Sequence, residues 1–182
     1  MVLTNTPICN FEETLKNFSL LDIDNKTKEC FDFIGEKGTL IMFICNHCPY
    51  VKAVINLLVN TTLELKHYGI NSIAIMPNDT EKYPEDNFEN MKRFSKINKF
   101  NFPYLLDESQ NVAKEFGAVC TPDFFGYNHH GKLNYRGRIT ELNRLTIISE
   151  KNDLLDAMVQ ISNTGKGPEK QFPSAGCSIK WK

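Results

Sequence analysis

Short apolar runs alternate with segments of helical period along the chain. The clearest run, 39–44, is continuously apolar, which is typical of a strand buried on both faces of a sheet. Pro49 then opens a helical segment that ends at Gly69, a residue type that commonly terminates helices. The apolar face of this segment consists of Val51, Val54, Ile55, Leu58 and Leu65. The pattern therefore predicts a buried central strand followed directly by a long helix.

The other predicted elements build an α/β fold around this pair. Strands are predicted at 18–22, 28–31, 71–76, 103–107, 123–127 and 133–138, and helices from about 85, at 111–116 and at 151–164. The strand–helix–strand order requires a right-handed crossover and parallel pairing of the central strands, to which the last hairpin adds antiparallel strands. We therefore expect a mixed central sheet with helices on both faces and an N-terminal β-hairpin.

Length and composition are those of one globular domain. The chain has 182 residues, of which 41% are hydrophobic and 24% charged. No repeat or linker divides it, so we expect a single domain over 1–182. The tail, 165–182, is rich in Gly, Pro and Lys up to Cys177, and the apolar residues of 177–181 indicate that it docks back onto the domain.

The net charge of −1 and the pI near 6.4 lack the basic footprint of a protein that binds nucleic acid or anionic membranes. The first 18 residues contain no apolar run of signal-peptide length, and the longest apolar stretch, 40–45, is too short to cross a bilayer. We therefore expect a cytoplasmic protein without a nucleic-acid partner, a membrane partner or a cofactor.

The most informative of the six cysteines is Cys48. Pro49 is favoured at the first helical position, which makes Cys48 the N-cap of the predicted helix. There it faces unpaired backbone N–H groups and the positive end of the helix dipole, both of which stabilise a thiolate and lower the thiol pKa. A buried structural cysteine is the alternative, but the position directly after a buried strand favours a reactive residue.

Cys45 and His47 complete the segment Cys45-Asn46-His47-Cys48. A C-x-x-C beside a β-α-β pattern is typical of a redox motif, although here both cysteines come at or before the helix start. Cys45 is therefore either a resolving thiol or a small residue that closes the strand. His47 either helps to deprotonate Cys48 or belongs to a solvated loop, which is the commoner role for a loop histidine.

Segment 43–52 resembles the active-site segment of the thioredoxin superfamily, and most closely a peroxiredoxin-like branch grouped with alkyl hydroperoxide reductase and thiol-specific antioxidant proteins. The similarity extends through 78–79, 83–87, 120–125, 135–138 and 176–181. It implies a thioredoxin-like three-layer sandwich over nearly the whole chain and redox chemistry at Cys48.

Two departures from the pattern of these families stand out. Val51 occupies the place of the second cysteine of a thioredoxin. A typical peroxiredoxin has Pro and Thr seven and three residues before its peroxidatic cysteine, whereas Ile41 and Cys45 stand there in this chain. The threonine that would orient a bound peroxide is thus absent, which favours a disulfide over a peroxide as the substrate.

The resemblance also implies that Thr121-Pro122 is a loop with a cis proline that faces Cys48, and that its backbone pairs with an extended thiol substrate. Cys120 would then lie near Cys48 as a second candidate for the resolving thiol. Cys177 is a third candidate, provided that the tail folds over the site. The predicted substrate-binding residues are His47, Pro49, Thr121 and Pro122.

Cys9 and Cys30 are interpreted as structural, one in the N-terminal arm and the other in a strand. Arg136 and Arg138 alternate in a predicted strand, where a solvated sheet edge or an ion pair is the commoner role for such residues. Neither arginine is therefore assigned to the catalytic set.

The predicted function is that of a thiol-disulfide oxidoreductase and antioxidant protein. The Cys48 thiolate attacks a disulfide or a peroxide, a second cysteine (Cys45 before Cys120) closes a disulfide, and an external dithiol reduces it. A cysteine-based peroxidase is the nearest alternative. The alternatives of another class are a zinc-binding module that uses Cys45, His47, Cys48 and Cys120, and a non-catalytic thioredoxin-fold interaction protein.

Overall fold

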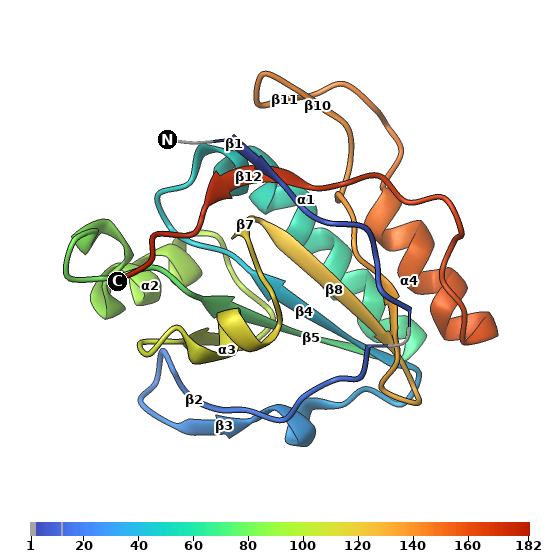
Figure 1. Cartoon of the computed structure of the whole chain (residues 1–182), viewed down its shortest axis with the longest axis horizontal. Helices are drawn as coiled ribbons and strands as arrows, with labels where there is room; N and C mark the ends of the chain where they lie inside the picture. The colour runs from blue at the N-terminus through green and yellow to red at the C-terminus, as the bar shows by residue number, and fades with distance from the viewer. Residues whose placement is uncertain (1–2, 12) are drawn as a thin grey trace.

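A seven-stranded mixed sheet forms the centre of the computed structural model, which describes residues 3–11 and 13–182 (Figure 1). Its strand order is β3-β2-β6-β5-β4-β8-β9. The central strand β4 (Gly38–Phe43) pairs in parallel with β5 (Ile70–Met76) and antiparallel with β8 (Asp123–Asn128). Every residue of β4 is buried, because both faces of the sheet are covered. The apolar run of the sequence thus forms a strand inside the sheet that is buried on both faces, as predicted.

The outer strands include the predicted N-terminal hairpin. β2 pairs antiparallel with β3 on one side and with β6 on the other, while β9 closes the opposite edge of the sheet beside β8. The outer strands are β2 (Ser19–Asp22), β3 (Thr27–Glu29), β6 (Tyr104–Leu106) and β9 (Leu133–Tyr135). A separate short hairpin joins β10 (Leu142–Asn143) and β11 (Thr146–Ile147).

Helices cover both faces of the sheet, as the sequence predicts. The side chains of β4 alternate between the two faces: Leu40 and Met42 pack in the core beneath α1 (Pro49–Leu65) and α4 (Asp153–Thr164). Ile41 and Phe43 pack in the opposite core with residues of α3 (Asn111–Glu115). The helix α2 (Phe88–Ile97) buries Met91 in the first of these cores. The architecture is a helix–sheet–helix sandwich.

The long helix α1 follows from the local sequence. Cys48 is its N-cap and Pro49 its first residue, where the missing N–H of proline leaves no hydrogen bond unmade. After a short 3-10 turn, Lys66–Tyr68, the chain reverses at Gly69, whose φ of 71° lies in the left-handed region that favours glycine.

The largest differences between the predicted and the observed elements concern α2, β9 and Cys30. Residues Pro84–Asp86 form a 3-10 turn, and α2 begins only at Phe88 because the Asn87 side chain caps it. The strand predicted at 133–138 ends at Tyr135. Cys30 does not lie in a strand: it begins a 3-10 turn, Cys30–Phe33, that packs in the core on the α3 face.

A second, three-stranded sheet lies over the start of α1. It contains β1 (Leu3–Asn5), β12 (Ala175–Ser178) and β7 (Cys120–Thr121), with β12 in the middle. In Figure 1 the blue β1 and the red β12 run side by side, so segments from the two ends of the described chain meet there. Among the described helices, none has both the length and the apolar character that crossing a membrane would require.

Candidate active site

Cys48 lies where the chain passes from the carboxyl end of β4 into α1, the edge at which open α/β sheets place their sites. Its side chain is completely buried. As a thiol, Cys48 Sγ donates a hydrogen bond to the carbonyl oxygen of Thr121 at 3.1 Å. The structure therefore brings Cys48 and the predicted loop Thr121-Pro122 together, and the peptide bond between those two residues is cis.

The pKa of Cys48 is lowered from 9.0 to about 5. The largest cause is a hydrogen bond from the Cys45 thiol, and the Cys177 thiol and the backbone N–H groups of Val51 and Cys177 also stabilise the thiolate. Burial acts in the opposite direction, because it disfavours the charged form. The N–H group of Val51 is the contribution expected at a helix start, whereas the two thiols belong to the tertiary structure.

Cys45 is the immediate neighbour of Cys48 in the site. Its Sγ lies 3.2 Å from Thr121 Oγ1, and its side chain is hydrogen-bonded to Cys48. The pKa of Cys45 is raised well above the ordinary value, first by that hydrogen bond and then by burial. Of the two thiols, Cys48 therefore ionises. Cys45 remains protonated and donates a hydrogen bond to the Cys48 thiolate.

Cys120 is adjacent to Thr121 on β7, but its side chain points to the other face of the strand. Neighbouring side chains in a strand alternate, and that of Thr121 faces Cys45. The Cys120 thiol instead donates to the carbonyl oxygen of Pro122 at 3.5 Å. Burial raises the pKa of Cys120, so it is a poor nucleophile in this position.

Cys177 reaches the site from the C-terminal tail. In the antiparallel pairing of β12 with β7, Cys177 stands directly opposite Thr121. Its side chain is hydrogen-bonded to Cys48, and burial, followed by the nearby Cys48, raises its pKa to about 12. From the sequence, Cys177 was only a conditional candidate for the resolving thiol, because its distance from Cys48 depends on how the tail folds.

His47 is held by a carboxylate that the sequence analysis did not single out. His47 Nδ1 lies 2.7 Å from Oδ2 of the completely buried Asp86, and the imidazole stacks on Tyr83 with 5.9 Å between ring centroids. The hydrogen bond to Asp86 raises the pKa of His47. This pairing favours the imidazolium, which has no free lone pair to accept the Cys48 proton. The only feature of the sequence that pointed to Asp86 was the similarity of segment 83–87 to the peroxiredoxin-like branch.

Asp86 also organises the loop that leads to Cys48. Its carboxylate accepts hydrogen bonds from the backbone N–H of Asn46 at 2.8 Å and from the side-chain amide of Asn78 at 2.7 Å. Ligand atoms of Cys45, His47 and Asp86 lie within 4.8 Å of one another, a spacing compatible with a metal ion. A metal ion would have to replace the hydrogen bonds of Asp86, and two members of the predicted zinc set, Cys48 and Cys120, are not in this group.

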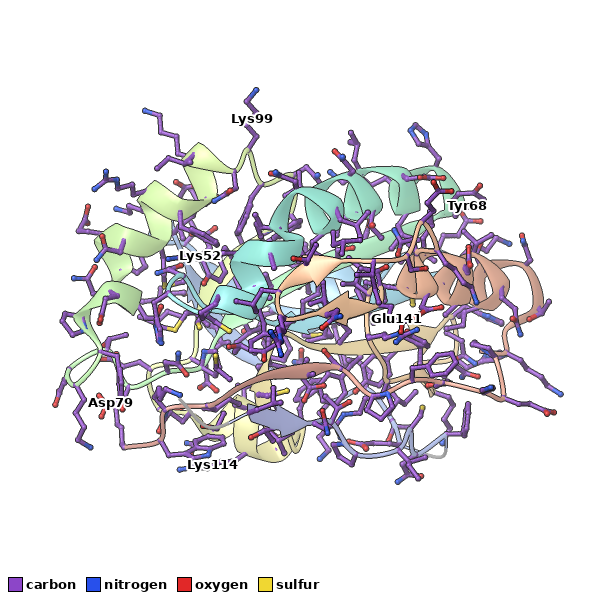
Figure 2. All side chains as sticks on the ribbon, turned by 90° about the horizontal axis from the view of Figure 1, so that it is seen from above. Lys52, Tyr68, Asp79, Lys99, Lys114 and Glu141 are labelled. Atoms are coloured by element: carbon purple, nitrogen blue, oxygen red, sulfur yellow. The ribbon has the colours of Figure 1, made fainter. Side chains whose placement is uncertain are left out.

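A cavity of about 340 Å³ opens beside the site. It lies between the first turn of α1 and α2, where Figure 2 shows Lys52 beside the light-green α2 with yellow sulfur atoms gathered below it. The residues lining it include Asn46, His47, Lys52, Glu85, Arg93 and Phe94. The cavity reaches the two residues that precede Cys48 and combines basic, acidic and aromatic side chains.

Residues 11–136, more than half of the chain, match the model of the AhpC/TSA family. The chain belongs to this family. A solved structure of an uncharacterized conserved protein from Geobacillus kaustophilus is 38% identical, with a TM-score of 0.93 over 100% of this chain and 97% of that chain. A thioredoxin domain of a thiol-disulfide oxidoreductase from Bacteroides vulgatus has a TM-score of 0.59 at 17% identity, over 70% of this chain and 87% of that chain, and shows the shared fold.

Among curated proteins, the thiol-disulfide oxidoreductase ResA of Halalkalibacterium halodurans is 26% identical over 121 residues, which are 66% of this chain. The chain spans less than two thirds of the length of the curated relatives it matches: 64% of ResA and 6% of protein Ycf2 of Pinus koraiensis, to which it is 23% identical over 76% of its own length. The predicted family and the thioredoxin-like fold are confirmed. The family and the match to the thiol-disulfide oxidoreductase ResA also agree with the predicted class, a thiol-based oxidoreductase.

Proposed function

We propose that this protein is a thiol-disulfide oxidoreductase whose nucleophile is the Cys48 thiolate. The observation that carries the proposal is that Cys48 alone among the six cysteines has a lowered pKa, whereas those of the other five are raised. The thiolate attacks one sulfur of a disulfide and releases the other as a thiol, which leaves a mixed disulfide at Cys48. A neighbouring thiol then displaces the bound substrate thiol, and an external dithiol reduces the new disulfide.

The surrounding residues have distinct roles in this proposal. Pro49 fixes the helix start, so that the N–H group of Val51 faces the sulfur. Cys45 donates a hydrogen bond to the thiolate, and Thr121 with Pro122 forms the surface against which the substrate sulfur lies. His47, paired with Asp86, contributes positive charge next to Cys48. We also place the protein in the cytoplasm, where a reducing environment would keep these thiols reduced.

A second candidate function, reduction of hydroperoxides, is favoured by the enclosure of Cys48. Because its side chain is completely buried beside β12, a small hydroperoxide can approach through the cavity at Asn46 and His47 more easily than a protein disulfide can. The thiolate would attack one peroxide oxygen, so that the O–O bond breaks and Cys48 becomes a sulfenic acid, while the leaving alkoxide takes up a proton from water to become an alcohol. Cys45, which replaces the threonine of a typical peroxiredoxin, supplies a hydrogen-bond donor at this point.

Steady-state assays with oxidised glutathione and with hydrogen peroxide, each with a dithiol as reductant, test both functions. Cys48→Ser should abolish turnover of both substrates, whereas Cys9→Ser and Cys30→Ser, which alter cysteines in the opposite core, should leave it unchanged. The substrate with the higher kcat/KM decides between the two functions. Turnover retained by the Cys48 variant would contradict the mechanism.

A further inference from the structure

The C-terminal strand β12 occupies the edge of β7 that an extended peptide would otherwise pair with. Cys177 and Ser178 of β12 pair antiparallel with Thr121 and Cys120 of β7. An exposed strand edge binds extended segments through its backbone hydrogen bonds, and side-chain pockets select the sequence. Here the chain supplies its own segment, visible in Figure 1 as the red strand between β1 and β7.

The register places the Cys177 sulfur on the face where Cys48 lies. Directly opposed residues of an antiparallel pair project their side chains to the same face of the sheet. Thr121, the partner of Cys177, directs Oγ1 to Cys45 and its carbonyl oxygen to Cys48 Sγ. The hydrogen bond between the side chains of Cys177 and Cys48 agrees with this placement.

Contacts on both sides of Cys177 hold the tail in this register. Before it, the hydroxyl of Ser174 donates to the carbonyl oxygen of Pro122 at 2.9 Å. After it, the backbone N–H of Lys180 donates to Asn78 Oδ1 at 2.9 Å, and the side-chain amide of Gln110 donates to the Lys180 carbonyl oxygen at 2.8 Å. On the edge opposite β7, β12 pairs with β1. The tail is therefore a fixed part of the site rather than a loose end.

Gly176 shows how closely the tail approaches the loop. A Cβ atom at this position would lie 2.2 Å from the carbonyl oxygen of Thr121, which is backbone and cannot move aside as a flexible side chain would. Only glycine permits this approach of the two strands. The neighbouring Cys177 is thus presented to Cys48 by a specific fit.

We propose that Cys177 is the resolving cysteine of this protein, and that β12 presents it to Cys48 in the manner of a substrate strand. The inference rests on the proposed function of Cys48. After attack on a disulfide, the Cys177 sulfur attacks the Cys48 sulfur, the Cys48–Cys177 bond forms, and the substrate leaves as a thiol that takes up the Cys177 proton. After attack on a hydroperoxide, the Cys48 sulfenic acid and the Cys177 thiol condense to the same disulfide and release water.

The positions of the other two candidates favour other roles. Cys120 points to the opposite face of β7 and hydrogen-bonds to Pro122. Cys45 lies in the segment between β4 and α1 and donates to the Cys48 thiolate, which assigns it to the activation of Cys48. Cys177 approaches instead from the strand opposite Thr121, the side from which a substrate strand would present its sulfur.

Non-reducing peptide mapping by mass spectrometry tests the inference. The wild type, Cys177→Ser, Cys45→Ser and Cys120→Ser are each treated with one equivalent of hydrogen peroxide or, separately, of oxidised glutathione. The wild type and the Cys45 and Cys120 variants should contain a Cys48–Cys177 disulfide. In Cys177→Ser, disulfide formation by Cys48 within the chain should fall at least about tenfold. This variant lacks the thiol that the fold holds beside Cys48 at an effective concentration in the mM range, and only an external thiol can take its place. Cys48 should then accumulate as the sulfenic acid or as the glutathione mixed disulfide.

Other outcomes would separate the two proposals. A main product linking Cys48 to Cys45 or to Cys120, or oxidised Cys48 with Cys177 still reduced in the wild type, would overturn the role of Cys177 and leave that of Cys48 intact. Cys48 unmodified by both oxidants would overturn both. Serine is only slightly smaller than cysteine and keeps a hydrogen-bond donor, so Cys177→Ser should fold, and an unchanged melting temperature would verify it.

Discussion

Burial has the same effect on all six cysteines, and the differences between them arise from the donors around each sulfur. Burial raises the pKa of Cys9 to about 11 and that of Cys30 to about 12. Cys48 is at least as well buried, yet its pKa falls to about 5, because the thiol of Cys45 and the other donors face its sulfur. Hydrogen bonds to the charged form therefore outweigh desolvation at this one residue.

The first prediction concerns the donor that contributes most to this balance. Cys45→Ala should raise the pKa of Cys48 by about 1–2 units, because a hydrogen bond to a charged group contributes about 1.5–3 kcal/mol and one pKa unit corresponds to about 1.4 kcal/mol. In the wild type the thiolate is present above a pH of about 5 and is lost as the pH falls through that value. The ultraviolet absorbance of the thiolate, measured against Cys48→Ser, follows the titration. Cys45→Ser retains an O–H donor and should shift the midpoint much less, and equal shifts in the two variants would contradict the assignment.

The second prediction concerns the pair of His47 and Asp86. The hydrogen bond to Asp86 is the main cause that raises the pKa of His47 above 6.5, whereas burial lowers it. Asp86→Asn should therefore lower the pKa of His47, and NMR titration of the imidazole would measure the change. The control is Glu85→Gln, which removes a weaker electrostatic contribution and should give a smaller decrease. A smaller decrease in Asp86→Asn than in Glu85→Gln would show that the ion pair does not control His47.

At the scale of elements, the sequence predicted those helices and strands whose position depends on neighbouring residues in the chain. The apolar run 39–44, Pro49 and Gly69 fix β4 and α1, and they place Cys48 at the helix start before any tertiary contact is considered. The contacts of Asp86 and Cys177 with the site were not predictable in this way. Each depends on a loop or tail far along the chain, whose register is set by packing and has no periodic pattern.

The contacts of Arg136 were likewise not predictable from the local pattern, and they lead to the third prediction. The strand predicted to contain it, β9, ends at Tyr135, and the Arg136 guanidinium turns inward to Asp123 of β8, with Nη2 2.9 Å from Oδ2 and both side chains buried. Arg136→Ala should destabilise the protein by about 3–5 kcal/mol near neutral pH, because it leaves the buried carboxylate without its cation. Urea unfolding measures this loss. Burial raises the pKa of Asp123 in the folded protein, so the loss should already shrink as the pH falls through the range above the ordinary Asp pKa, because a protonated Asp123 needs no cation.

A matched control for this substitution is Arg138→Ala. Arg138 also pairs with a carboxylate, Asp153 at 2.8 Å, but its side chain is 25% exposed. Solvent can take over part of that interaction, so the loss should be smaller than for Arg136. Similar losses in the two variants would mean that burial of the Arg136–Asp123 pair has no particular importance for the fold.

At the scale of the whole molecule, the site is closed by parts of the chain that are far apart in sequence. The sheet core positions Cys48, the loop at Thr121 lies over it, and β1 and β12 cover the loop. Removing the sheet β1-β12-β7 from this position would uncover the sulfur without altering the core strands. Access to Cys48 should therefore be governed by local opening of the tail rather than by global unfolding.

The last prediction uses Gly176 to measure that opening. Gly176→Val places side-chain atoms against the Thr121 carbonyl oxygen. It should destabilise the closed position of β12, relative to the opened tail, by about 1–3 kcal/mol, the usual cost of overpacking. A change of that size raises the open fraction about 5- to 150-fold. Modification of Cys48 by a bulky maleimide in the folded protein, mapped by mass spectrometry, should accelerate accordingly. Ala175→Val is the control, because Ala175 borders a cavity of about 100 Å³ that can accept the added methyl groups. If both variants react at the wild-type rate, the tail does not control access, and the maleimide must reach Cys48 by another route, such as the cavity at His47 and Lys52.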